Sequence, residues 1–210
     1  MGHIMNDKAI EVYRGLLLEI RFRIEAIDDV ISGKVRLRAK IAEEFCYLQL
    51  RMICEIIAIG CLVIHGELSS LKSDLFKTYK ADWIMSELAK LHPKFFPAPL
   101  EIKDDATTNP PSWVYLKSGF LTHRELAILW NRHTGAALHR GGARNNLWPE
   151  RPLDFNKITI WREKIVALLN RHVIPSADEE LIWHFLMLDQ NGDVTSNLFK
   201  RVDVTPPMSP

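Results

Sequence analysis

The chain of 210 residues is 47% hydrophobic and 25% charged, a composition that fits one globular domain with a sizeable buried core. Its 27 Lys and Arg residues against 26 Asp and Glu residues give a net charge of +1, which excludes the strong overall field of proteins that coat nucleic acid or anionic membranes. No apolar run approaches the ~20 residues of a membrane span, and no secretory signal pattern opens the chain, so we expect a cytoplasmic protein without a membrane partner.

Two long helices are predicted first. Apolar residues recur every three or four positions from Ile10 to Ile31, and Gly33 marks the end of this amphipathic helix. A second helix is expected over about 36–65, and its second half is apolar nearly all round, as in a central helix. Inside it, Arg51 and Glu55 lie four residues apart, which we interpret as a structural or interface ion pair rather than a catalytic group. One apolar stripe of this helix comprises Ile41, Phe45, Leu48, Met52, Ile56, Ile59 and Val63.

The next part of the chain combines helices with a long connection. A helix is expected over about 73–91, and Pro93 stops it. The segment 92–120 is predicted to be a long irregular connection, because prolines recur along it. Further on, Asp154 can cap another helix that is expected over about 155–172.

The C-terminal region changes its period from that of a helix to that of a strand. Residues 181–188 are rich in strand-forming residues, and Asn191-Gly192 is a strong signal for a tight turn. Residues 194–204 can then return as the partner strand. We therefore expect a β-hairpin that leans on the helices, since a two-stranded hairpin alone is only marginally stable.

Together these elements predict a mainly α fold, an antiparallel helical bundle of about five helices with a C-terminal β-hairpin. The bundle is assigned to residues 5–175, including the proline-rich connection 92–120. The hairpin is assigned to residues 178–204, as an appendage on the same domain.

Candidate chemistry concentrates on the helix that begins near Leu121 and ends at Gly141-Gly142. Thr122 and Glu125 form the pattern of a capping box at its start. Arg132 and His139 lie seven positions apart, nearly two turns, so they are expected to project from one face with Gly135 between them, while His133 turns toward the core. Basic residues continue into the following loop, where Arg140, Arg144 and Asn145 are the predicted anion-binding residues.

An arginine and a histidine can act together without a metal ion. Histidine moves protons near neutral pH, and a guanidinium binds a phosphate and neutralises its developing charge. These are the two functions needed when RNA is cleaved by attack of its own 2′-hydroxyl. A solvated or dimer-facing polar patch and an anion or nucleotide site explain the same residues. No cofactor is predicted, and the cysteines Cys46, Cys54 and Cys61 have no zinc spacing and are interpreted as buried thiols.

A helical bundle with Arg-x6-His late on one helix, followed by a basic loop that contains asparagine, resembles the HEPN superfamily, whose hallmark is Arg, four to six residues, then His. The resemblance covers about residues 5–173. It implies a helical bundle that forms a homodimer, with the motifs of two protomers facing one cleft, and metal-independent RNA cleavage in active members. By this resemblance His139 would transfer the proton and Arg132 would bind the phosphate.

The sequence therefore supports two hypotheses. In the first, the protein binds or cleaves RNA with Arg132 and His139, helped by the basic loop. In the second, it is a non-catalytic helical bundle that acts through protein contacts or binds a small anion. The first requires Arg132 and His139 to be exposed together, which coordinates can test.

Overall fold

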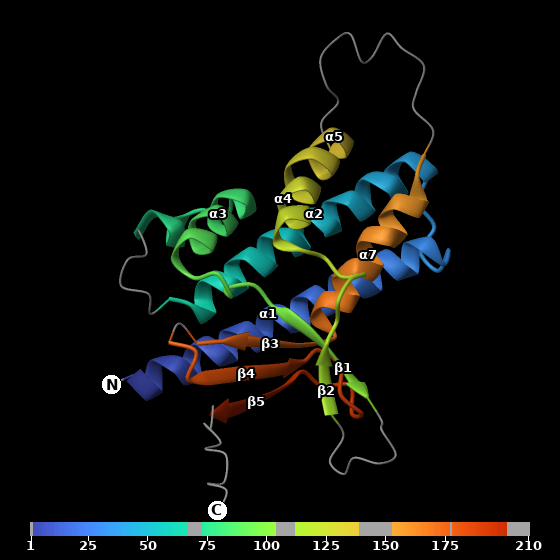
Figure 1. Cartoon of the computed structure of the whole chain (residues 1–210). Coiled ribbons are helices and arrows are strands. Elements are labelled where there is room, and N and C mark those ends of the chain that lie inside the picture. Colours follow the sequence, from blue (N-terminus) through green and yellow to red (C-terminus); the bar gives the residue numbers. More distant parts are fainter. Residues whose placement is uncertain (1, 67–72, 104–111, 139–152, 177, 201–210) are drawn as a thin grey trace, which may run out of the picture.

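The computed structural model describes residues 2–66, 73–103, 112–138, 153–176 and 178–200 (Figure 1). Over these residues the chain is mainly α, as predicted, with a smaller antiparallel sheet. The helices are α1 (Gly2–Ile31), α2 (Ala39–Ile64), α3 (Ala81–Leu91), α4 (His123–Ile128), α5 (Thr134–Leu138) and α7 (Phe155–Leu169), with the short helices η1 (Ser73–Lys77) and η2 (Leu129–His133). The strands are β1 (Ala98–Lys103), β2 (Ser112–Tyr115), β3 (Arg171–Pro175), β4 (Leu181–Leu186) and β5 (Thr195–Lys200).

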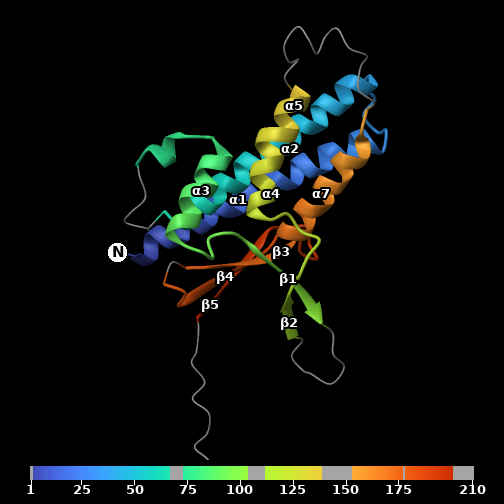
Figure 2. The ribbon, with the colours of Figure 1, turned by 45° about the horizontal axis from the view of Figure 1, so that its top comes forward.

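Helix α2 is the central helix of the fold. It lies beside α1 along most of its length, and it also contacts α3, η2, α5 and α7 (Figure 2). By length and composition, Ala39–Ile64 is apolar enough to cross a membrane, with a mean hydropathy of 1.9. However, 56% of the most apolar 18-residue stretch of this helix is buried inside the fold. This is the pattern of a core helix in a soluble domain.

The most deeply buried line of α2 is not the predicted stripe but the opposite side of the helix. Leu50, Cys54 and Cys61 are completely buried. Of the predicted stripe, Ile41 and Leu48 are 51% and 43% exposed, and only Ile56 is buried. The three cysteines, including Cys46, are free thiols in the core, as expected. Burial raises the pKa of Cys46 to about 11 and those of the other two still further. These thiols are therefore protonated at neutral pH.

The close approach of α1 and α2 depends on Gly60. A Cβ atom added there would lie 2.8 Å from the ring of Tyr13, which is closer than real Cβ contacts come. The Tyr13 ring cannot easily retreat, because it is buried and its hydroxyl lies 2.8 Å from Nε2 of His172. We expect Gly60→Ala to lower the free energy of unfolding by about 1–3 kcal/mol in urea denaturation, through overpacking.

Gly15 on α1 provides the matched control for this prediction. A Cβ atom added at Gly15 meets nothing within 4 Å among the described residues. Gly15→Ala is therefore expected to raise the free energy of unfolding by up to about 1 kcal/mol, because alanine is the better helix former. Equal stabilisation by Gly60→Ala would contradict the close contact with Tyr13.

The five strands form one antiparallel sheet in the order β2-β1-β3-β4-β5. Side chains on one face pack against the helices, as where the Phe185 ring lies 4.5 Å from that of Tyr13. Helix α1 is also hydrogen-bonded to the connection between β4 and β5. Arg14 donates to the Val194 carbonyl, and Arg21 donates to the Gly192 carbonyl. The sheet therefore lies against α1 at one side of the helical layer (Figure 1).

Three segments differ from the sequence prediction. The single helix expected over about 73–91 is divided into the 3-10 helix η1 and α3, which begins at Ala81 after an extended Lys80. The connection 92–120 was expected to be irregular but contains β1 and β2, and its prolines hid the strand signal, although Pro99 fits into β1 opposite His172. The helix expected to reach 172 ends at Leu169, and the chain then enters β3. As a result β4 and β5, which pair from Leu181 with Lys200 to Leu186 with Thr195, belong to a five-stranded sheet rather than a separate hairpin.

Candidate functional site

The helix that carries Arg132 begins as the sequence predicted. The backbone N–H of Glu125 donates to Oγ1 of Thr122, and the Thr122 N–H donates back to the Glu125 carboxylate, which completes the capping box. Lys164 of α7 pairs with the same carboxylate. The capping box and this ion pair together fix where α4 begins relative to α7.

Midway along, the helix widens into the π-helical turn η2. A π-turn takes more residues per turn than an α-helix, so it shifts the side chains that follow around the helix axis. The buried line consequently runs through Leu126, Trp130, Thr134 and Ala137. His133 was expected on this line, but Thr134 takes the core position. His133 is only half-buried, with its ring 5.4 Å from that of Trp161.

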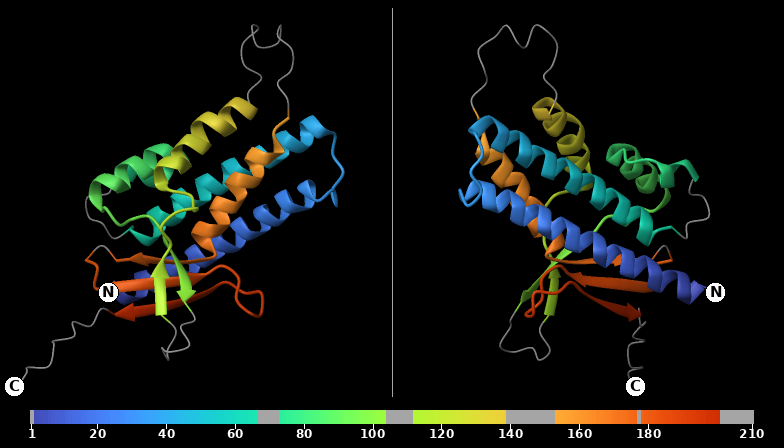
Figure 3. Two further views of the ribbon diagram at one scale, coloured as in Figure 1. Left: turned by 45° about the vertical axis from the view of Figure 1, so that its right-hand side comes forward. Right: turned by 180° about the vertical axis from the view of Figure 1, so that it is seen from behind.

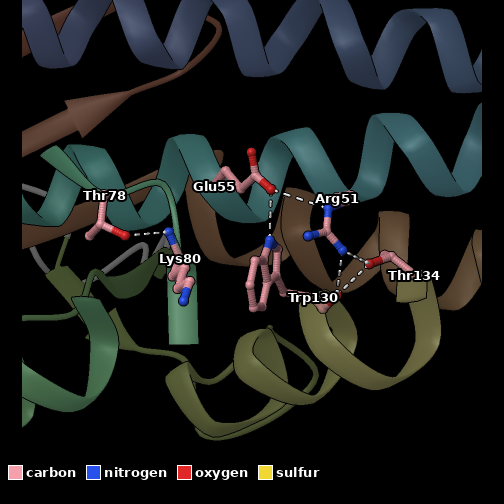
Figure 4. Close-up of polar contacts among 6 residues, drawn as sticks. All are labelled: Arg51, Glu55, Thr78, Lys80, Trp130 and Thr134. Carbon is pink, nitrogen blue, oxygen red and sulfur yellow. Dashed lines mark hydrogen bonds and ion pairs between the residues drawn. The ribbon is translucent and has the colours of Figure 1, made fainter. Parts of the chain in front are cut away.

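The turn is held by a polar cluster on α2 (Figure 4). Nε of Arg51 lies 3.2 Å from the Glu55 carboxylate, and the same oxygen accepts a 2.8 Å hydrogen bond from the Trp130 indole. The Arg51 guanidinium lies over the Trp130 ring at 4.5 Å, and it also donates to the Trp130 carbonyl and the Thr134 hydroxyl. The structure agrees with the structural interpretation of Arg51 and Glu55, because both side chains are engaged in holding η2.

Arg132 leaves this turn in the direction of solvent. It is exposed, as is the preceding Asn131, and no carboxylate forms an ion pair with it in the part of the chain that is described. Near it, a Cβ atom added to Gly135 would meet no described residue within 4 Å. Among the described residues, the surface around Arg132 therefore has room for a ligand next to a guanidinium whose charge no carboxylate neutralises.

Beside Arg132, a pocket of about 410 Å³ opens between α2, α5 and α7, and His133 and Lys157 lie on its wall. Burial lowers the pKa of His133, and the nearby positive charges of Lys157 and Arg132 lower it further. His133 is thus neutral at pH 7. The pocket is lined by Tyr47, His133, Ala136, Ala137, Leu153, Asp154 and Lys157.

The same end of the helical layer carries further positive groups. The C-terminal ends of α1 and α5 and the N-terminal ends of α2 and α7 all point toward it (Figures 1 and 3). Arg36 and Arg38 are exposed before α2, and no side chain caps the first turn of that helix. This region, which we call the basic end, combines the exposed Arg36, Arg38 and Arg132 with Lys157, which is paired with Asp154. The dipoles of the two helix N-termini favour an anion there, and those of the two C-termini oppose it.

The remaining predicted site residues, His139, Arg140, Arg144 and Asn145, lie outside the described residues. The structure therefore locates Arg132 alone of the predicted set. The chain leaves Leu138 at the basic end and returns at Leu153 on the wall of the pocket. Both connections of the predicted basic loop therefore begin at this end of the molecule.

Other histidines were interpreted from the sequence as a helix-end residue and a strand residue, and the structure buries both. His172 lies in β3, where its Nδ1–H donates to the Leu169 carbonyl, so its Nε2 must accept the hydrogen bond from Tyr13. Burial lowers the pKa of His172 to about 3. The ring of His184 on β4 is centred 4.4 Å from that of Trp113 and is tilted against it. Neither ring is accessible enough to act on a substrate.

A second pair of buried histidines, His65 and His92, was not predicted as a pair, although the position of His65 at the helix end indicated its contact with the last carbonyls of α2. The rings of His65, after α2, and His92, after α3, lie 5.1 Å apart. Nδ1 of His65 is bonded to the Cys61 carbonyl, and the Nε2 atoms of both rings lack a hydrogen-bond partner within the described residues. Burial lowers the pKa of each ring, and the neighbouring His92 lowers that of His65 further. Only their positions after two helices gave a signal in the sequence.

Comparisons with protein-family models, with curated proteins and with solved structures found no match to this chain. The functional argument consequently rests on the geometry of the basic end.

Proposed function

We propose that the protein binds RNA at the basic end of its helical layer, with Arg132 as a phosphate contact, and that it cleaves the bound strand without a metal ion. The observation that carries this proposal is the exposure of Arg132, unpaired among the described residues, next to a pocket that holds His133 and Lys157. A guanidinium in this setting can bind a phosphate oxygen in bidentate fashion.

The distribution of charge at the basic end supports a polyanion as the ligand. Lys34 and Lys40 are already paired with carboxylates, whereas Arg36, Arg38 and Arg132 are exposed and form no ion pair with a described residue. Several separated cations suit a strand with repeating phosphates better than a single small ion. Because the net charge of the chain is only +1, this attraction must be local.

Cleavage would follow from the pairing of Arg132 with His139. The 2′-oxygen of the RNA attacks the adjacent phosphorus while His139 accepts the 2′-hydroxyl proton, and the bond from phosphorus to the 5′-oxygen breaks. The 5′-oxygen takes a proton from water, which leaves a 2′,3′-cyclic phosphate and a 5′-hydroxyl. Arg132 would neutralise the charge on the phosphate during the attack. This assignment follows the resemblance to the HEPN superfamily, with the helices as an antiparallel bundle and the strands as additions.

Binding is tested by replacing Arg132. Arg132→Ala is expected to weaken binding of single-stranded RNA about tenfold, because one charge-assisted phosphate contact is lost. The slope of log affinity against log salt should also fall by about 0.7, the value for one phosphate contact on a single strand. Fluorescence anisotropy of a labelled RNA across a salt series measures both quantities.

Arg124 supplies the matched control. It is exposed on the same helix, about 12 Å along the axis from Arg132 by the rise of an α-helix, and its removal changes the charge equally. Arg124→Ala should leave affinity and salt slope nearly unchanged. Equal weakening of RNA binding by both variants would show that the loss comes from the change in net charge alone. Unchanged binding by Arg132→Ala would exclude Arg132 from the interface.

A second candidate function is the binding of a small anion in the 410 Å³ pocket, where Lys157 would have to exchange its partner Asp154, which also caps α7, for the anion. Pyrophosphate or a nucleotide would then protect the protein against thermal unfolding, and RNA would bind no better than its mononucleotides. Lys157→Ala should remove that protection. In the RNA-binding protein, affinity should instead rise with strand length.

A further inference from the structure

The ends of α2 and α3 bring two buried histidines together. His65 directly follows α2 and His92 directly follows α3, and the two residues are only 2% and 4% exposed. Their rings are centred 5.1 Å apart. The basic end lies at the other end of α2, about 40 Å away by the rise of a helix of this length. This pair is therefore separate from the surface that we assign to RNA binding.

The hydrogen bond of His65 determines which of its ring nitrogens carries the proton. Nδ1 lies 2.9 Å from the Cys61 carbonyl, which can only accept, so Nδ1 is the protonated nitrogen of the neutral ring. Nε2 then carries an unshared electron pair, and burial keeps it unprotonated at neutral pH because it lowers the pKa of the ring. Metal-binding histidines have this arrangement, in which one nitrogen donates to a carbonyl and the other binds the ion.

The Nε2 atoms of both rings need a partner that the described residues do not supply. Both atoms are buried, and neither has a hydrogen bond to a described residue. Buried polar atoms without a partner are costly, so a group that binds both nitrogens would stabilise the fold. With Zn–N bonds of about 2.0–2.1 Å and a tetrahedral angle between them, two ligand rings are centred about 5 Å apart. The observed separation of the rings matches this geometry.

The charges around the pair favour a cation. Both histidines occupy the C-cap position of their helix, where the helix dipole places partial negative charge. Burial lowers the pKa of His92, whereas the nearby Glu179 carboxylate raises it. The Lys94 ammonium, which is paired with Glu179, acts in the opposite direction but more weakly than the carboxylate.

A pocket of about 500 Å³ borders the pair. Pro175 of β3 and Glu179 of the following turn line it, together with Lys94. These residues also act on the two rings. Burial lowers the pKa of His65, and the carbonyls of Cys61 and Pro175 raise it. The pocket therefore lies where an ion from solvent would reach the histidines.

We propose that His65 and His92 bind one zinc ion through their Nε2 atoms, in a site that joins the C-terminal ends of α2 and α3. The described residues contain no group of three or more His, Cys, Asp or Glu side chains that could hold a metal ion. Water or a ligand from the pocket would therefore complete the coordination, as at zinc sites that keep open positions. Imidazole suits several transition metals, and the tetrahedral spacing of the rings favours zinc among them.

Calorimetric titration of the metal-free full chain with Zn²⁺ tests the site. The wild type should bind one ion that His92→Phe binds at least about a hundredfold more weakly, since loss of a residue behind the ligands already costs about 10–100-fold. Zn²⁺ should also raise the thermal midpoint of the wild type and leave that of His92→Phe unchanged. Equal affinity of the two proteins would overturn the proposal.

His184→Phe is the matched control. His184 is also 4% exposed, and its ring nitrogens have no hydrogen bond to a described residue. Its ring lies against Trp113 and Phe199 rather than against another histidine. His184→Phe should therefore keep the wild-type affinity for Zn²⁺. An equal loss of affinity in His184→Phe and His92→Phe would contradict a site made by the His65 and His92 pair.

X-ray absorption at the zinc edge tests the ligands in the wild-type chain and does not depend on the folding of a variant. The spectrum should show a four-coordinate ion with two imidazole ligands at about 2.0–2.1 Å. A six-coordinate ion with oxygen ligands, or an ion with one or no imidazole, would show surface binding only and would overturn the proposal. Cleavage of RNA in EDTA tests the proposed function separately, because it requires no metal ion.

Discussion

Acidification from pH 7 to pH 4.5 is expected to lower the free energy of unfolding by several kcal/mol, mainly because histidines are buried in their neutral form. His172 makes the largest contribution, since burial lowers its pKa to about 3. In the unfolded chain the pKa of a histidine is about 6.5, so between these two values the unfolded state binds one proton more than the folded state. Stability from this residue is present above pH 6.5 and falls by roughly 1.4 kcal/mol per pH unit below it.

The other buried histidines act in the same direction. Burial lowers the pKa values of His65, His92 and His184, so each of them also favours the unfolded state as the pH falls. Measurements above pH 4.5 keep the titration of the carboxylates largely outside the window. Urea unfolding followed by circular dichroism at half-unit steps of pH gives the slope.

A double variant isolates the contribution of His172. In Tyr13→Phe/His172→Phe both polar partners are replaced by rings of similar shape, so stability at pH 7 should change little while the slope decreases by about 1.4 kcal/mol per pH unit. His172→Phe alone leaves the Tyr13 hydroxyl buried without its partner, and it should lose about 1–3 kcal/mol at pH 7. An unchanged slope in the double variant would show that His172 does not control acid stability.

Replacement of His139 is expected to have the largest effect on activity. If Arg132 and His139 act together, His139→Ala should reduce cleavage of single-stranded and transfer RNA in EDTA by about 10²–10⁴-fold, the usual contribution of a general base. RNA affinity should change far less than in Arg132→Ala, because a neutral histidine makes only a small contribution to phosphate binding. Gel analysis of time courses at saturating protein separates the rate from the affinity.

His133 is the appropriate control, because among the described histidines it is the one next to Arg132 on the same helix, and its pKa is lowered by burial. His133→Ala should preserve most of the cleavage rate. Loss of cleavage in His133→Ala together with full activity in His139→Ala would transfer the role of base to the pocket residue. Equal cleavage by the wild type and both variants would remove both histidines from the chemistry.

Local signals predicted a large part of the fold. The helix start at Thr122 and Glu125 could be read directly, because a capping box involves only residues three positions apart. The periodic apolar residues likewise predicted α1 and the central position of α2. Strand β1 was missed because prolines weakened its pattern. The buried side of α2 was not identified because that helix is apolar nearly all round.

Long-range contacts explain what the sequence could not predict about the candidate site. The position of His133 depends on η2, which is held by Arg51 and Glu55 from another helix. The bond between Tyr13 and His172 joins residues 159 positions apart, so no local pattern could indicate it. The exposure of Arg132 agrees with the prediction. The pocket beside Arg132 could not be predicted, because it is formed by the packing of α2, α5 and α7.

The π-helical turn also has a meaning for how this helix can change. A π-turn accommodates one residue more than the α-helical turn that it replaces, so η2 amounts to an insertion absorbed inside a packed helix. Trp130 and Thr134 of this region are buried against α2, and Arg132 lies on its solvent side. Substitutions on the solvent side of η2 can therefore change the side chains that are exposed to a ligand, while the core contacts of this helix with α2 stay the same.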